Sequence, residues 1–162
     1  MKRPYRLFII FSLIIGALFG LFYVSEWLWP ELWGSRSLGN NLYLINWEKG
    51  AKIVVYCKNP RGNTCYSGSY VVPAGPVSAT KEDVREAVTS EHYIIILSYL
   101  IEQDKYKYYV ISKEYGELNN PPLEIREKFL YPFEDYSHFS NKCDSLGINK
   151  IIPLGWQKRN LE

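Results

Sequence analysis

The chain has 162 residues, with 19 lysines plus arginines against 17 aspartates plus glutamates, for a formal net charge of +2. Beyond residue 36 the basic and acidic residues are equal in number, so this part lacks the basic surface that binding to nucleic acid requires. Its 126 residues suffice for one domain with a hydrophobic core and are too few for two. Fourteen tyrosines favour β-strands and adaptable binding surfaces.

The first segment is long and apolar. Residues 7–24 carry no charge, and 18 helical residues extend roughly 27 Å, close to the thickness of a bilayer's hydrocarbon core. Lys2, Arg3 and Arg6 precede this run, and basic residues resist translocation. The sequence therefore predicts a single-pass helix in a bacterial inner membrane, with the N-terminus in the cytoplasm and the remainder exported. The lipid bilayer is the first predicted partner.

Three tryptophans follow this run, Trp27, Trp29 and Trp33. Their amphipathic rings favour the headgroup region, so they are predicted to lie at the membrane interface. A cleaved signal peptide is the competing interpretation, since it shares the basic start and the apolar middle. The length of the apolar run and the lack of a small-x-small cleavage pattern argue against it. Gly16 and Gly20 form a small-xxx-small pair, which leaves a homo-oligomer open.

The remaining sequence predicts an α+β fold, in which a transmembrane helix precedes a small, mostly antiparallel sheet with a C-terminal helix packed on it. Residues 1–33 form the N-terminus, the membrane helix and its tryptophan flank, 34–41 a polar linker, 42–156 the exported domain and 157–162 a tail. β-formers bounded by turn residues predict strands over 42–47, 52–57, 65–72, 84–89, 93–100 and 106–112. The stretch at 84–89 could instead begin a helix. The last part predicts helices over 123–130 and 133–146 and an edge strand over 148–154.

Cys57 and Cys65 flank a turn between two predicted strands. If those strands pair, the two side chains lie opposite each other at a separation that a disulfide can bridge. Export to an oxidising compartment permits the bond. The alternative is that both cysteines serve as small hydrophobic residues. Cys143 lies on the apolar stripe of the last predicted helix and is expected to be a buried free thiol.

Few residues suggest chemistry. His138 shares a helical face with Glu134, but a metal site needs three or four converging ligands and no spacing supplies them. Cys143 and His138 make a poor pair of nucleophile and base, because side chains five positions apart on a helix point in different directions. His92 stands alone. The sequence has no phosphate-binding loop, nucleophile elbow or P-loop lysine, so no catalytic, metal or cofactor site is predicted.

Short phrases carry a resemblance to a known family. They are residues 38–44, residues 52–57 and residues 65–73, followed by the apolar strand at 93–97 and the helix ending near residue 148. This pattern resembles a family of small bacterial envelope proteins, often lipoproteins, whose domain has no assigned function. The chain departs from the lipoprotein members because it lacks the cysteine that would be lipidated. The resemblance implies a place in the envelope and a fold class, and no catalytic residue.

These observations favour a membrane-anchored, extracytoplasmic binding or accessory module. It would be a subunit of an envelope assembly or an immunity-like protein, with a protein partner in the envelope and no nucleic acid or cofactor. The alternative is an envelope enzyme, such as a hydrolase, whose groups converge from distant positions. A polar pocket holding His92 or His138 with carboxylates would favour the enzyme, and a tyrosine-rich surface would favour binding.

Overall fold

The computed structural model divides the chain into two units, residues 1–34 and 35–162, each considered by itself. The structure describes residues 15–17, 20, 35–47, 50–62, 64–65 and 68–157. In the first unit only residues 15–17 and 20 are described, and they are helical. Most of the predicted membrane helix over 7–24, and all of Trp27, Trp29 and Trp33, lie outside the described residues. Within the described ranges, no helix is long and apolar enough to span a bilayer.

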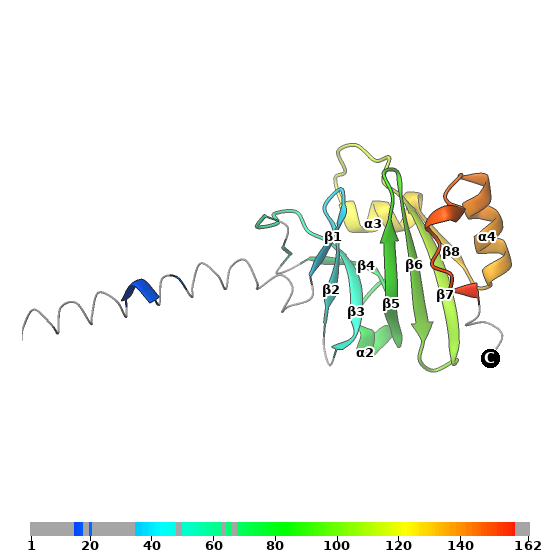
Figure 1. Ribbon diagram of the computed structural model, residues 1–162, viewed down its shortest axis with the longest axis horizontal. Helices are drawn as coiled ribbons and strands as arrows, with labels where there is room; N and C mark the ends of the chain where they lie inside the picture. The colour runs from blue at the N-terminus through cyan, green and yellow to red at the C-terminus, as the bar shows by residue number, and fades with distance from the viewer. Residues whose placement is uncertain are drawn as a thin grey trace, which may run out of the picture. The chain divides into compact units, whose positions relative to one another are not determined.

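The second unit contains two antiparallel sheets of four strands each (Figure 1). The first sheet has the order β1-β2-β3-β4, with strands Arg36–Gly39, Leu42–Asn46, Lys52–Tyr56 and Ser69–Val72. The second has the order β5-β6-β7-β8, with strands Glu82–Thr89, Tyr93–Leu100, Lys105–Ser112 and Leu130–Phe133. Every neighbouring pair is antiparallel.

The predicted fold class is therefore wrong. A transmembrane helix followed by one sheet was expected, but two small sheets are present, and no described helix could span a membrane. The first missed strand, β1, lies in the supposed linker. Its one core residue is Leu38, and the turn at Asn40 and Asn41, which have φ of 49° and 61°, folds it onto β2. Asparagine tolerates this left-handed conformation, so a polar segment forms a hairpin.

The helices differ from expectation in extent. Helix α2, Val77–Thr80, is a single turn between the sheets. The predicted helix over 123–130 is α3, Pro121–Glu124, which continues as the π-helical segment η2, Ile125–Phe129. The last long helix, α4, spans Tyr136–Ser145, and Asp135 caps it by accepting a hydrogen bond from the backbone N of His138 at 2.9 Å. The edge strand expected over 148–154 is absent from the described residues, and the 3₁₀ turn η3, Asn149–Ile151, stands there.

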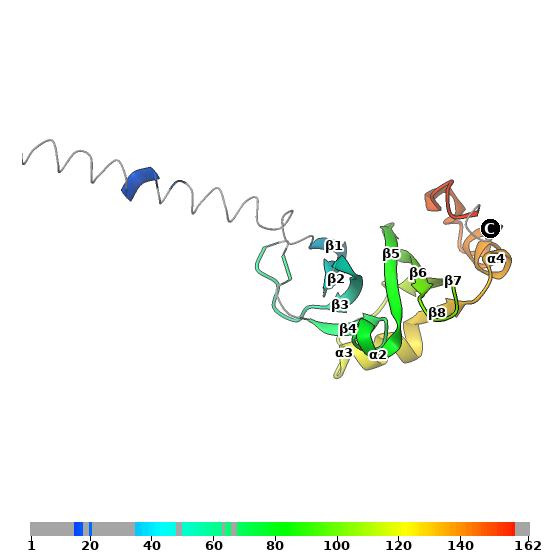
Figure 2. The ribbon, with the colours of Figure 1, turned by 90° about the horizontal axis from the view of Figure 1, so that it is seen from below.

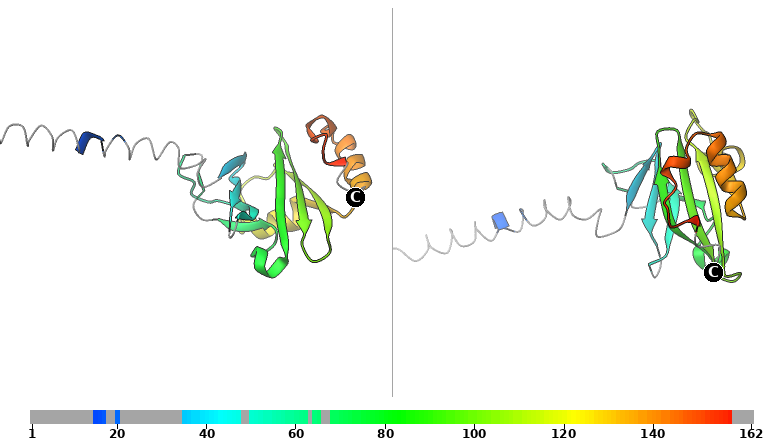
Figure 3. Two further views of the ribbon diagram at one scale, coloured as in Figure 1. Left: turned by 60° about the horizontal axis from the view of Figure 1, so that its bottom comes forward. Right: turned by 45° about the vertical axis from the view of Figure 1, so that its right-hand side comes forward.

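The core has three buried clusters, two on the faces of the second sheet and a third on the first sheet that includes Tyr43, Ile53 and Val55. Figure 2 shows the first sheet, the second sheet and α4 following one another as layers. The face toward the first sheet contributes Ile94, Ile96 and Ile111 to one buried cluster, and the opposite face contributes Ile95 and other residues to a second. Helix α4 and the buried Trp156 cover that second cluster, and Figure 3 shows α4 lying over the sheet. Because β6 is an inner strand with both faces covered, its apolar run does not alternate.

Candidate functional site

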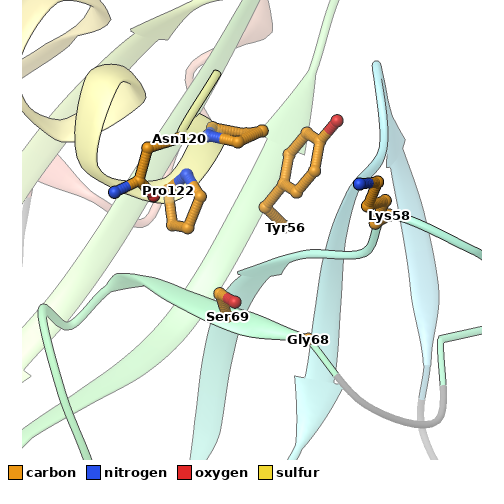
Figure 4. Close-up of a pocket in the computed structure, with 7 residues that line it drawn as sticks. Tyr56, Lys58, Gly68, Ser69, Asn120 and Pro122 are labelled. Atoms are coloured by element: carbon orange, nitrogen blue, oxygen red, sulfur yellow. The ribbon is translucent and has the colours of Figure 1, made fainter. Parts of the chain in front are cut away.

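A pocket of about 420 Å³ opens between the loop that joins β3 to β4 and the start of α3 (Figure 4). Its volume falls within the range typical of ligand sites. The pocket combines aromatic and proline surfaces with polar side chains. Its lining residues are Tyr56, Lys58, Gly68, Ser69, Asn120, Pro121 and Pro122.

The local sequence explains how these residues meet. Tyr56 is the last residue of β3 and Ser69 the first of β4. Because these strands are antiparallel neighbours, the loop between them begins and ends at the same edge of the sheet. A disulfide between Cys57 and Cys65, whose Cα atoms are 6.0 Å apart, ties this loop. Gly68 lies so close to β3 that a Cβ atom there would come within 2.7 Å of Val55 Cγ2. Only glycine permits this approach, which sets one wall of the pocket.

The other wall is the beginning of α3. Asn120 occupies the N-cap position, and Pro121 and Pro122 open the helix, where proline costs no hydrogen bond. The side chain of Asn120 makes no capping bond. Instead, the backbone N of Asn120 donates to Glu124 Oε1 at 2.8 Å. The amide of Asn120 is thus left available to a ligand.

The polar side chains of the pocket are little used within the protein. The hydroxyl of Tyr56 accepts a long hydrogen bond of 3.4 Å from Asn41 Nδ2 and donates to no described group. Within the described part of the chain, Lys58 forms no ion pair, and the Ser69 hydroxyl has no hydrogen-bond partner. Lys58, Ser69 and Asn120 are all exposed. These donors are therefore free to serve a ligand.

No acidic residue is among the described residues that line the pocket. The nearest carboxylate along α3, Glu124, is engaged elsewhere. It accepts from the backbone of Asn120 and pairs with Lys128 Nζ at 3.3 Å. The hydrogen bond from Asn120 is the main reason that the pKa of Glu124 is lowered. Lys58 is the one charged lining residue, so the pocket is positive.

The residues weighed for catalysis lie elsewhere. His138 contacts Asp135 at the exposed start of α4, and the side chain of His92, 58% exposed, lies 3.5 Å from Glu114. Cys143 is fully buried, and burial raises the pKa of its thiol to about 12. Among the described residues, no group of three or more side chains could hold a metal ion. Of the residues singled out from the sequence, only Cys57 and Cys65 are associated with the pocket, through its loop.

A second polar cluster lies between the sheets. Glu82 Oε1 accepts hydrogen bonds of 2.5 Å from both Ser98 Oγ and Tyr109 Oη. All three residues are buried, with exposed fractions of 7%, 0% and 5%. Burial and the neighbouring Glu82 raise the pKa of Tyr109. Because the Ser98 hydroxyl is sealed from solvent and already bonded, this cluster stabilises the fold and offers no access to a ligand.

Sequence reasoning missed the pocket because its walls are far apart in the chain. One wall comes from Tyr56, Lys58, Gly68 and Ser69, and the other from residues 120–122. Each stretch shows turn chemistry, with Asn59-Pro60 in the first and the proline pair in the second. Neither stretch alone indicates a partner. Only the contact of α3 with β3 and β4 brings the two together.

The chain matches no family model, no curated protein and no solved structure.

Proposed function

We propose that this chain is an accessory binding module of the cell envelope that recognises a protein partner through the pocket between the β3–β4 loop and α3. The observation that carries the proposal is the convergence of Tyr56, Lys58, Ser69 and Asn120 around one cavity with unused hydrogen-bonding capacity. Polar groups that line an open, partly apolar cavity are the common arrangement of a binding site.

The disulfide supports the place of action. Cys57 and Cys65 are linked in the loop that carries Lys58 and Gly68. Structural disulfides persist in oxidising compartments and are rare where thiols are kept reduced. A disulfide that shapes the wall of a binding pocket is consistent with action outside the reducing interior of the cell.

The composition of the pocket supports binding over catalysis. Its described lining offers no imidazole or carboxylate, the groups that most often serve as general bases and would activate a serine hydroxyl. The tyrosine and the two prolines provide apolar surface at low entropic cost. This combination suits recognition of a protein segment better than transformation of a substrate.

Photo-crosslinking in intact cells tests the proposal. The full chain would carry p-benzoylphenylalanine in place of Ser69, and a matched control would carry it in place of the exposed Gln103, which does not line the pocket. We expect position 69 to give a discrete adduct with one protein, and position 103 to give none of that mass. Failure of position 69 to give an adduct, or the same adduct from both positions, would overturn the proposal.

A further inference from the structure

The charge and the apolar surface of the pocket indicate which class of ligand it binds. We infer that it takes an extended acidic peptide segment of the partner, with a carboxylate side chain at Lys58 and a neighbouring apolar side chain against Tyr56 and the prolines. This inference rests on the proposed binding function and specifies the ligand of the same site.

Charge is the first argument. Lys58 is exposed and unpaired within the described part of the chain, and no carboxylate lines the pocket beside it. Arg61, in the same loop, is also exposed, and its side chain makes no ion pair with the described residues. Two cations without internal partners attract an anion and repel a basic segment.

The donors around Lys58 match a carboxylate. The hydroxyls of Tyr56 and Ser69 and the amide of Asn120 can all donate hydrogen bonds. An ionised carboxylate has only acceptors, and hydrogen bonds to a charged acceptor are stronger than those between neutral groups. A carboxylate is therefore attracted by the ammonium and can accept hydrogen bonds from donors that line the same pocket, whereas a cationic side chain would be repelled by Lys58.

The apolar surface argues for a peptide over a small anion. In Figure 4 the ring of Tyr56 stands between the prolines and Lys58. A side chain adjacent to the carboxylate would cover this ring and the proline faces, and a cavity of about 420 Å³ exceeds the needs of one carboxylate group. An acidic residue flanked by an apolar one fills both parts of the pocket.

Selection from a random hexapeptide library displayed on phage tests the inference with the full-length protein. We expect peptides retained by the wild type to be enriched in aspartate and glutamate beside leucine, isoleucine or phenylalanine. Lys58→Glu should abolish that enrichment. Lys105→Glu is the matched control, since Lys105 is exposed and lies outside the pocket, and it should leave the enrichment unchanged. For a selected peptide, glutamate-to-glutamine replacement should weaken binding about fivefold to tenfold.

Recovery of no peptides, of peptides without acidic enrichment, or of the same acidic peptides by Lys58→Glu would overturn the inference. A thermal melt like that of the wild type establishes that the Lys58→Glu protein is folded. The two experiments distinguish failure of the proposed binding function from failure of the proposed ligand class. A specific adduct from position 69 without acidic enrichment preserves the binding function and removes this ligand class. Acidic enrichment without an adduct in cells preserves the ligand class and removes the proposed protein partner.

Discussion

At the scale of single residues, the buried carboxylate of Glu82 shows how this fold tolerates a polar group between its sheets. Burying a carboxylate is unfavourable unless hydrogen bonds replace its water. Ser98 and Tyr109 both donate to the same oxygen at 2.5 Å. Lys107 also lies near, with its Nζ 5.3 Å from the centre of the Tyr109 ring. The two hydroxyl groups supply the hydrogen bonds that the buried carboxylate would otherwise receive from water.

Removing one donor from this cluster should destabilise the protein. Tyr109→Phe keeps the ring in place and deletes the hydroxyl, which leaves Glu82 with Ser98 as its donor. We expect the free energy of unfolding to fall by about 1–3 kcal/mol, as for other hydrogen bonds to buried charged groups. Urea unfolding followed by circular dichroism measures it. Tyr131→Phe is the control, because Tyr131 is 41% exposed, and it should change little. Equal effects of the two variants would contradict this role.

The pair of Asp135 and His138 should make the start of α4 sensitive to pH. Their side-chain hydrogen bond is the main reason that the pKa of His138 is raised above 6.5 and that of Asp135 is lowered below 3.8. Both groups are charged between these two values, so the pair stabilises the helix terminus fully in that window. The contribution of His138 is lost as the pH rises through its raised pKa, and that of Asp135 as the pH falls through its lowered one.

An NMR titration of the imidazole checks this directly. The midpoint of His138 should lie above 6.5 in the wild type, and Asp135→Asn should move it back toward that value, because the charged partner is gone. A midpoint that does not respond to Asp135→Asn would show that the interaction has no effect on the titration.

At the scale of elements, the loop between β3 and β4 differs from its expected form in an informative way. The cysteines were expected opposite each other in paired strands, with the second strand starting at Cys65. Strand β4 instead begins at Ser69, and the linked cysteines stand outside both strands. Turn residues correctly indicated a reversal, but the length of the loop depends on how Gly68 approaches Val55, which is a tertiary contact.

Loss of the disulfide should therefore affect the pocket as well as stability. In the double variant Cys57→Ser, Cys65→Ser, the short loop is no longer closed, and we expect the free energy of unfolding to fall by about 2–3 kcal/mol. Lys58 and Gly68 belong to that loop, so crosslinking from position 69 should also weaken. Dithiothreitol should reproduce both effects in the wild type and change nothing in the double variant. Equal stability of the oxidised wild type and the double variant would contradict a structural disulfide.

Elements were recognised where local pattern and burial agree. The unbroken apolar run of β6 and the turn-bounded strands β3 and β7 were predicted nearly in place. Strand β8 was missed because Pro132 and its neighbours read as an interruption, whereas an edge strand tolerates proline. The apolar residues Ile151 and Ile152 pack as a turn against the second cluster. Apolar character alone did not distinguish that turn from a strand.

At the scale of the whole unit, the division into two sheets could not be predicted from the order of the strands. Alternation shows that a strand has a buried face, but it does not show which strands share a sheet. Here the short connection through α2 passes the chain from one sheet to the other, and β5 pairs with β6 instead of β4. The pocket has the same origin, since its walls come from the first sheet and from α3, which follows β7 of the second sheet along the chain.

The layered arrangement predicts that the two buried clusters on opposite faces of the second sheet stabilise each other. Trp156 is fully buried, packs 5.9 Å from Phe139 between ring centres, and donates from Nε1 to Glu86 Oε2 at 2.7 Å. Trp156→Ala should lower the free energy of unfolding by about 3–5 kcal/mol through the cavity it leaves. Leu154→Ala is the matched control, because Leu154 is 96% exposed, and it should be nearly neutral.

Hydrogen exchange shows whether this loss spreads beyond the outer layer. Strands β6 and β7 contribute one face to each of the two clusters, so loosening the outer cluster should destabilise the inner one as well. Amides of β2, in the first sheet, should then exchange faster in Trp156→Ala by about the same factor as amides of β6. If β2 keeps its protection while β6 loses it, the sheets open independently. The pocket, which depends on the first sheet and α3, would then be insulated from the outer layer.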